Sequence, residues 1–325
     1  MINGRWLFLC CLLFCLTVQA QDDVMTLRLM TYNIRHGAGM DDVIDLNRQA
    51  KVISDAMPDV VGLQEVDSCV KRSGYVHQAA ILAENLGMYS TFGPAIPLTG
   101  GKYGVAILSK EKPLSYQNIP LPGKEKRTLL VCEFQEYVFA CTHLDLEEEN
   151  RLASLDIILE EAARWDKPFF ICGDWNDYPN STLITRMRRN FSFLNNITNN
   201  SVNFTFPART PKNIIDYIAS YGRVVKSIRK RQVINEPEAS DHRPVFVDVV
   251  FDGPTPVLPI SQEDCQQSAV HVQTSVYDLS GRRINSQLST LNSQFSTGAN
   301  NSQFSILNSQ LKKGLYIVGG KKILK

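Results

Sequence analysis

Polar residues of a few chemical types stand where apolar runs of the chain end. Asn33 follows LRLMTY, Glu65 follows DVVGLQ and His143 follows YVFACT. Asp174 and Asn176 come directly after PFFICG. Each of these residues alone is consistent with a turn or a solvated strand end. The repetition of the pattern at several strand ends points instead to one shared site.

A second set of polar residues lies inside or before other apolar runs. Asp216 interrupts IIDYIA, and a carboxylate in an apolar strand needs a partner. Asp241 and His242 precede the strand-type run RPVFVDVVF. Arg127 opens RTLLVCEF, and a site residue and a surface arginine at the strand end are equally good interpretations of it.

Together these residue types suit one reaction. Carboxylate and amide oxygens favour Mg²⁺, Mn²⁺ or Ca²⁺ over zinc. A histidine beside a carboxylate is held in place and kept basic, while a second histidine with an asparagine can donate hydrogen bonds to phosphoryl or leaving oxygens. The set therefore predicts the metal-assisted hydrolysis of a phosphate ester.

Strands and helices alternate through the part of the chain that carries these residues. Periodicity predicts strands at 27–34, 59–66, 103–110, 127–134, 137–144, 168–176, 214–220 and 240–251. It predicts helices at 45–57, with Asp45 as N-cap, at 76–87, at 147–165 and at 181–190. Hairpins mixed with crossovers indicate sheets covered by helices, an α/β layered domain.

Seven motifs in order then give a family resemblance. TYNIRHG, LQEVD, YGVAILSK, THLD, GDWND, IDYI and SDHRPV closely resemble the endonuclease/exonuclease/phosphatase superfamily over roughly residues 26 to 251. The resemblance implies a four-layer α/β sandwich, in which two mixed β-sheets pack face to face with helices outside. It also implies a metal-dependent phosphoric ester hydrolase.

The resemblance implies metal-, water- or phosphate-positioning roles for five of the polar residues. Asn33 and Glu65 stand where the family has its metal-proximal asparagine and metal-binding glutamate. Asp174 and Asn176 match the pair that positions the attacking water and the phosphate. Asp241 matches the aspartate that lies near a metal ion or the water.

The remaining roles concern the two histidines, Asp216 and Arg127. His242 matches the general base or phosphate-charge stabiliser, and Asp216 matches the buried aspartate that orients it. His143 matches a histidine that contacts the phosphate or protonates the leaving oxygen in nucleases and sphingomyelinases, which favours a phosphodiester substrate. Arg127 falls where deoxyribonuclease-like members carry a phosphate-contacting arginine. The acid that supports the first histidine in those members is not recognisable in this sequence.

Charge and composition bear on the substrate. The 325 residues carry a net charge of +1, so no overall basic field attracts nucleic acid, which weighs against a dedicated polynucleotide nuclease. No apolar hairpin suggests membrane insertion. The substrates left open are nucleic acid, phospholipid headgroups and inositol or sugar phosphates. A phosphomonoesterase is the alternative activity, and a non-catalytic phosphate- or partner-binding module is the alternative of another class.

The two ends of the chain differ from its middle. Residues 1–20 are typical of a signal peptide, which predicts export to the medium or the cell surface. Residues 21–252 form the expected catalytic domain, here expected to be a monomer, and 253–268 a proline-containing linker. Residues 269–325 hold an NSQ repeat between VYDLSGRRI and LKKGLYIVGGKKILK. These two motifs resemble the sorting domain of the type-nine secretion system, so the export machinery is an expected partner.

Cysteine usage predicts no disulfide framework. Five cysteines remain after the signal peptide, an odd number. Cys132 and Cys141 lie in consecutive predicted strands, where they either pair across a hairpin or serve as small buried apolar residues.

Overall fold

The structure of the protein is a computed structural model that describes residues 24–253, 315–318 and 321–324. The chain divides into two compact units, Met1–Pro256 and Val257–Lys325. The first unit contains every polar residue singled out above. None of the helices in the described residues is long and apolar enough to span a membrane.

The first sheet has six strands in the order β11-β12-β1-β2-β4-β3. Its strands are β1 Val24–Asn33, β2 Val60–Ser68, β3 Tyr89–Leu98, β4 Gly101–Ser109, β11 Val225–Val233 and β12 Val245–Asp252. Only β1 and β2 pair in parallel, and their crossover contains a helix. The sheet is therefore mixed, as predicted.

The second sheet also has six strands, in the order β5-β6-β7-β8-β10-β9. Its strands are β5 Ser115–Leu121, β6 Arg127–Glu133, β7 Val138–His143, β8 Phe169–Asp174, β9 Phe191–Phe193 and β10 Asp216–Tyr221. Here β7 and β8 form the parallel pair. Each sheet thus has one parallel pair at its centre, and the carboxyl ends of these pairs carry polar residues.

Four α-helices accompany the sheets. They are α1 Leu46–Ala56, α2 Gln78–Leu86, α3 Glu148–Ala162 and α4 Thr182–Met187. The Asp45 side chain accepts a hydrogen bond from the Asn47 amide and caps α1 as predicted. Gly87 ends α2 in the left-handed conformation that glycine adopts without strain.

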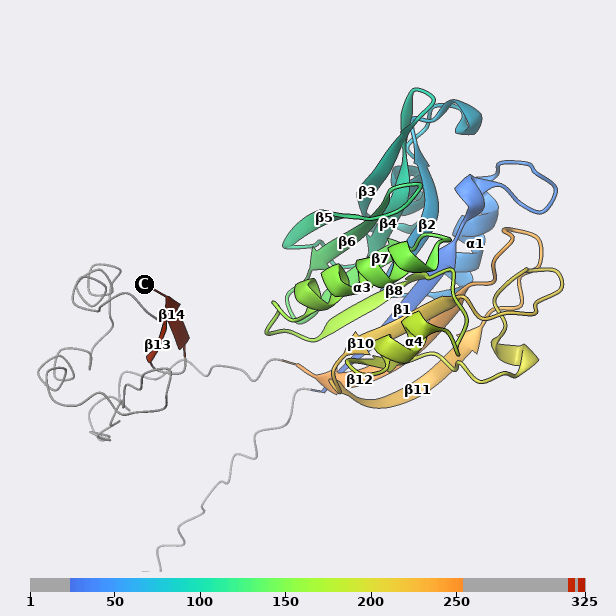
Figure 1. The fold of residues 1–325 in the computed structure, drawn as a ribbon. Helices are drawn as coiled ribbons and strands as arrows, with labels where there is room; N and C mark the ends of the chain where they lie inside the picture. The colour runs from blue at the N-terminus through green and yellow to red at the C-terminus, as the bar shows by residue number, and fades with distance from the viewer. Residues whose placement is uncertain (1–23, 254–314, 319–320, 325) are drawn as a thin grey trace, which may run out of the picture. The chain divides into compact units, whose positions relative to one another are not determined.

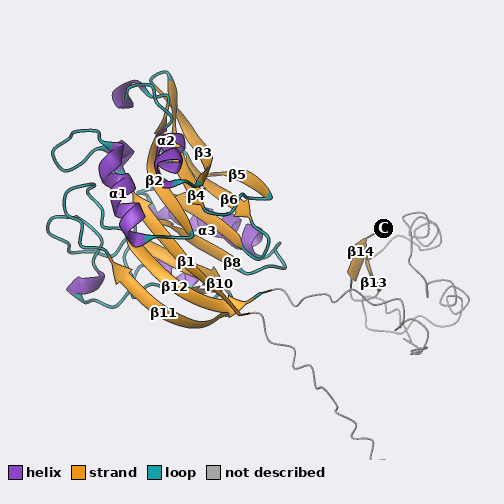
Figure 2. Ribbon diagram, turned by 180° about the vertical axis from the view of Figure 1, so that it is seen from behind, coloured by secondary structure: helices purple, strands orange, loops and turns teal. Residues whose placement is uncertain are grey.

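Three apolar clusters define the layers of the domain. One fills the space between the two sheets, with Leu29, Phe139 and Val247 among its buried members. The second lies between the second sheet and α3 and α4, and the third between the first sheet and α1 and α2. Figure 1 shows α3 and α4 in front of the sheets, and Figure 2 shows α1 and α2 on the opposite side. The four-layer α/β sandwich is confirmed.

The structure adds four strands that the sequence pattern does not predict, β3, β5, β9 and β11. Each of them is an edge strand of its sheet. Cys132 and Cys141 are buried free thiols rather than a disulfide. In the second unit, β13 Leu315–Val318 and β14 Lys321–Leu324 pair antiparallel. The segments expected to form a signal peptide and a linker, and the NSQ repeat, lie outside the described residues.

Candidate active site

Strand register brings three of the predicted site residues together in the second sheet. Asp174, the last residue of β8, is paired with His143 at the end of β7. It is also paired with Asp216 at the start of β10. Since neighbouring strands lie about 5 Å apart, this register alone places the three side chains at one sheet edge.

The first sheet contributes Asn33 and Glu65. Asn33 ends β1 and is paired with Gln64 in β2. The pairing of β2 with β4 shifts between Leu63 and Val66, and Glu65 has a positive φ of 58°. Such a bulge re-aims a side chain and is common beside active sites. Here it turns the Glu65 side chain into the cavity described below.

Asn33 connects the two sheets. Its Nδ2 donates hydrogen bonds to Glu65 Oε1 and Asp174 Oδ2, both at 3.1 Å. Its Oδ1 accepts a hydrogen bond from the backbone N–H of Arg35 at 3.1 Å. The backbone donor fixes the orientation of the amide. Asn33 therefore points its nitrogen, and not its oxygen, at the two carboxylates.

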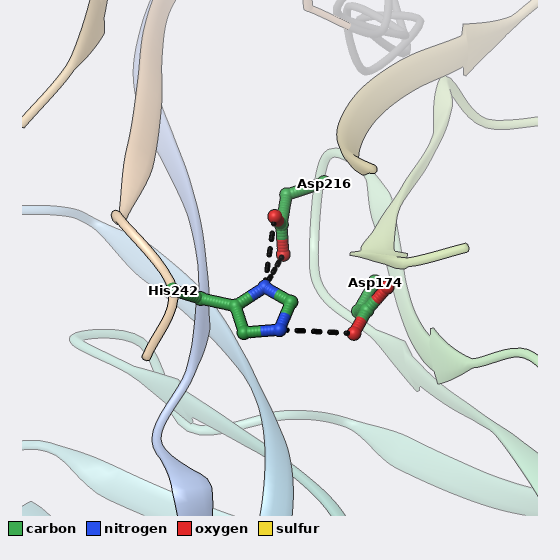
Figure 3. A group of neighbouring side chains, drawn as sticks. All are labelled: Asp174, Asp216 and His242. Atoms are coloured by element: carbon green, nitrogen blue, oxygen red, sulfur yellow. Dashed lines mark hydrogen bonds and ion pairs between the residues drawn. The ribbon is translucent and has the colours of Figure 1, made fainter. Parts of the chain in front are cut away.

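His242 and Asp216 form a buried pair at the centre of the site (Figure 3). Nδ1 of His242 donates to both carboxylate oxygens of Asp216, at 3.0 and 3.2 Å. Nε2 of His242 lies 3.6 Å from Asp174 Oδ2. The Phe206 ring packs against the imidazole with a centroid distance of 4.7 Å. The imidazole is thus fixed in one tautomer, with Nε2 facing Asp174.

The loop before β12 is tied to the first sheet. Ser240 Oγ donates a 2.7 Å hydrogen bond to the carbonyl oxygen of Asn33. Asp241, the next residue, is half-buried and lies 4.0 Å from the Arg35 guanidinium. Ser240, Asp241 and His242 come shortly before the buried strand β12. The hydrogen bond from Ser240 to β1 fixes this loop, so that Asp241 and His242 lie at the site.

Burial perturbs the acids and bases of the site. It raises the pKa of Glu65, and it raises the pKa of Asp174 to about 7. Burial alone would lower the pKa of His242, but the nearby carboxylates of Asp216 and Asp174 outweigh it and raise the pKa to about 10. Without a cation, this cluster of carboxylates therefore retains protons at neutral pH.

His143 has a different environment. Its Nε2 accepts a hydrogen bond from Asn176 Nδ2 at 3.0 Å, and the same amide nitrogen donates to the carbonyl oxygen of Leu144. Its Nδ1 lies 3.5 Å from Nη1 of Arg127. Burial and the Arg127 charge hold the pKa of His143 well below its usual value. Within the described residues no carboxylate contacts Nδ1, so the supporting acid of the deoxyribonuclease-like members has no counterpart at this nitrogen.

Arg127 is buried rather than exposed at the surface. Its Nη1 forms a 2.9 Å ion pair with Glu125. Its Nε is buried and lies 4.0 Å from Asp145 Oδ2, within ion-pair distance but beyond hydrogen-bonding distance.

One cavity of about 560 Å³ unites these residues. The predicted residues that line it are Glu65, Arg127, His143, Asp174, Asn176, Asp241 and His242. Asn33 and Asp216 are buried behind this lining and act through their hydrogen bonds. Arg151 and Asp177 form a buried 3.0 Å ion pair in the cavity wall that the sequence pattern does not predict. The position of Asp177 directly after the matched Asp174 and Asn176 is the one available signal.

The residues present fit a divalent metal ion. The carboxylates of Glu65 and Asp241 face the cavity, and burial raises the pKa of both Glu65 and Asp174, so a bound cation would favour their charged forms. Hard oxygen donors of this kind suit Mg²⁺, Mn²⁺ or Ca²⁺. Ligand atoms of Asp174, Asp216 and His242 also lie within 4.8 Å of one another. However, both oxygens of Asp216 are engaged by His242, which makes the Glu65 side of the cavity the better metal position.

Known proteins similar to this chain support the family resemblance of its motifs. The model of the Endonuclease/Exonuclease/phosphatase family matches residues 30–242. The chain belongs to this family. It is therefore a phosphoric ester hydrolase of a family whose members depend on divalent metal ions. A comparison with curated proteins found no match.

Solved structures share the fold. A family member from Beutenbergia cavernae is 24% identical, covers 71% of this chain and 73% of its own, and has a TM-score of 0.58. One from Bacteroides vulgatus is 21% identical over 70% of this chain and 100% of its own, with a TM-score of 0.58. A mannosyl-6-phosphatase from Bacteroides thetaiotaomicron is 18% identical over 69% of this chain and 100% of its own, with a TM-score of 0.57. At these identities the likeness concerns the fold alone.

Proposed function

We propose that this hydrolase cleaves phosphodiesters in the cavity, with His242 as the general base and a divalent ion held by Glu65 and Asp241. The observation that carries the proposal is the His242–Asp216 pair, whose Nε2 faces Asp174 at the cavity wall. The carboxylates raise the pKa of His242 to about 10, so the charge of a bound cation would be needed to release the Nε2 proton and free this nitrogen to accept one from water. A carboxylate that holds an imidazole in one tautomer prepares its other nitrogen to accept a proton. The ion, when bound, neutralises the negative charge of the phosphoryl group.

The other residues position the reactants. Asp174 accepts hydrogen bonds from Asn33 and from the Asn176 backbone, so its remaining capacity is directed at the attacking water. Asn33 orients the carboxylates of Glu65 and Asp174 through its Nδ2, while its Oδ1 accepts a hydrogen bond from the Arg35 amide. Arg127 lines the cavity, so its guanidinium is placed to contact a phosphoryl oxygen.

His143 contributes as a neutral residue in this proposal. Asn176 donates to its Nε2, and its pKa is low, so it does not carry the proton needed by a leaving group at neutral pH. It holds Asn176 in position against the phosphoryl group. The preference for a diester, which the match of His143 to diesterases suggests, therefore rests on resemblance more than on geometry.

A phosphomonoesterase is the second candidate. The buried Arg127 guanidinium at the cavity wall suits the additional negative charge of a monoester. The similar protein from Bacteroides thetaiotaomicron is named a mannosyl-6-phosphatase, which is consistent with a monoester substrate in this fold.

The proposal is tested with protein that lacks residues 1–20. Hydrolysis of bis-p-nitrophenyl phosphate and of p-nitrophenyl phosphate is measured with Mg²⁺ or Mn²⁺ and again with EDTA. We expect metal-dependent cleavage of the diester that falls by on the order of 10²–10⁴-fold in His242→Ala. Cleavage of the monoester alone would favour the second candidate. Activity on neither substrate, with the variant unchanged, would favour a non-catalytic binding module.

We also propose that the protein is exported through residues 1–20 and acts outside the cytoplasm as a monomer. The C-terminal residues 269–325 serve as the address read by the export machinery. The support is the sequence pattern of the two ends. Terminal sequencing of protein recovered from the culture medium tests both points, and an intact N-terminus would contradict the first.

A further inference from the structure

A second, smaller hollow adjoins the catalytic cavity. It has a volume of about 230 Å³, and we call it the side hollow. Tyr178 and Asn213 line both the catalytic cavity and the side hollow. A molecule whose phosphate lies in the cavity can therefore extend past these two residues into the side hollow.

Tyr178 stands at the boundary with an exposed ring on a fixed backbone. Tyr178 is 55% exposed, which is a large fraction for an aromatic residue. Its carbonyl oxygen accepts a hydrogen bond from the Ser181 amide at 3.0 Å. The preceding carbonyl oxygen, that of Asp177, accepts one from the hydroxyl of Tyr217 at 2.7 Å. The ring thus projects from a rigid support, which lowers the entropic cost of stacking a ligand on it.

The side hollow offers polar side chains that are available for a ligand. Those of Asn180, Asn199 and Asn213 line it and form no hydrogen bond with other described residues. Lys212 also lines it, is exposed, and forms no ion pair within the described part of the chain. An amide presents both a donor and an acceptor, as a hydroxyl group does. Several unengaged amides around one hollow therefore suit a ligand rich in hydroxyl groups.

We propose that the side hollow and Tyr178 bind the organic part of the substrate, and that this part is a sugar ring. The inference rests on the proposed function and names the substrate class for the same site. The apolar face of the ring stacks on Tyr178, and its hydroxyls contact the amides of Asn180, Asn199 and Asn213. A volume below the roughly 300–1,000 Å³ of pockets for drug-sized ligands suits a single ring.

Other organic groups fit this lining less well. An acyl chain offers no hydrogen-bonding group to the three amides, so they would contribute nothing to its binding. A nucleobase would stack on Tyr178 equally well and could pair with one amide along its edge, whereas the hydroxyls around a sugar ring can reach all three amides. The amides therefore favour a ring rich in hydroxyl groups. Tyr178, on which this ring stacks, is then a residue that determines specificity.

Binding of two non-hydrolysable phosphonates tests the proposal. Glucose 6-phosphonate and methylphosphonate are titrated by calorimetry into protein lacking residues 1–20, with Mg²⁺ present. We expect the sugar phosphonate to bind at least about tenfold more tightly than methylphosphonate, because stacking and amide contacts add to a common phosphonate contact. In Tyr178→Ala the two dissociation constants should agree within about twofold, with that of methylphosphonate unchanged.

The matched variants separate a specific effect from a general one. Tyr178→Phe keeps the ring and should retain the preference, as should Tyr116→Ala, which removes an exposed tyrosine that lines neither hollow. Equal binding of both phosphonates by the unaltered protein, or a preference that survives Tyr178→Ala, would overturn the proposal. Tighter binding of adenosine 5′-phosphonate than of the sugar phosphonate would overturn the choice of a sugar ring.

The outcomes also distinguish this inference from the proposed function. If the sugar phosphonate is preferred but no phosphate ester is hydrolysed, the binding inference stands and the catalytic proposal fails. If esters are hydrolysed but the two phosphonates bind equally, the catalytic proposal stands and the side hollow has no role in recognition. If neither phosphonate binds, the side hollow is not a substrate site.

Discussion

Asp216 determines which nitrogen of His242 carries a proton. Both of its oxygens accept from Nδ1, which leaves Nε2 directed toward Asp174 and the cavity. An amide in place of the carboxylate would remove the charge that favours a protonated ring, and it would permit the opposite tautomer. The geometry of the side chains would change little, because aspartate and asparagine have nearly the same shape.

We therefore expect Asp216→Asn to lower kcat for metal-dependent ester hydrolysis by on the order of 10²–10⁴-fold, with little change in KM. Steady-state kinetics on the substrate found in the first assay provide the measurement. Asp248→Asn is the matched control, since Asp248 forms an ion pair with Arg28 away from the cavity. Equal losses in the two variants would show that Asp216 has a structural role only.

The sequence could indicate the types of residues at the site but not all of their contacts. The motifs select seven residues that line one cavity, together with Asn33 and Asp216 behind them. They do not reveal that Asn33 turns its nitrogen toward the carboxylates, because this depends on the Arg35 amide. They also do not reveal that Arg127 in β6 approaches His143 in β7, because this contact depends on the conformations of the two side chains.

At the scale of secondary structure, the sequence predicts the inner strands and misses the edges. All eight predicted strands lie inside the two sheets, where burial on both faces produces continuous apolar runs. The four missed strands are the edges. Strand β11 reads VKSIRKRQV and has mostly exposed side chains, as is usual for an edge protected from further pairing. Hydrophobic periodicity carries little signal for such a strand.

Gly62 in β2 sets the distance between the two sheets near the site. A Cβ atom at this position would lie 2.3 Å from Cys172 Sγ and 2.9 Å from Cys141 Sγ. The close approach places the end of β2, and with it Glu65, against the ends of β7 and β8. A larger residue here would therefore separate the metal-binding side of the site from Asp174.

We expect Gly62→Ala to reduce the free energy of unfolding by about 1–3 kcal/mol, the usual effect of overpacking, and to reduce kcat/KM. Urea unfolding and steady-state kinetics would measure the two effects. Cys172→Ala removes the nearer sulfur, so the double variant should recover part of the loss in stability. Strict additivity of the two substitutions would contradict the proposed contact.

At the scale of the whole molecule, the active site reduces stability at alkaline pH when no metal is bound. The pKa of His242 is about 10 in the folded protein, above the value of 6.5 for a free histidine. The folded state thus binds this proton more tightly than the unfolded state. The resulting stabilisation is fully present below pH 6.5 and is lost as the pH rises toward 10.

In EDTA, the midpoint of urea unfolding should therefore fall between pH 7 and pH 9, and it should fall less in His242→Ala. Comparing the variant with the unaltered protein removes the contributions of other titrating groups. Parallel pH dependence in the two proteins would show that the site does not hold the extra proton.

The proposed function requires a divalent ion bound on the Glu65 side of the cavity for ester hydrolysis. The most direct measurement is the rate of hydrolysis as a function of Mg²⁺ concentration for the unaltered protein and for Glu65→Gln, after removal of metal with EDTA. We predict no activity without added metal, and at least about tenfold more Mg²⁺ for half-maximal activity in the variant, which loses a charged ligand. Full activity in EDTA, or identical Mg²⁺ curves for the two proteins, would contradict the claim.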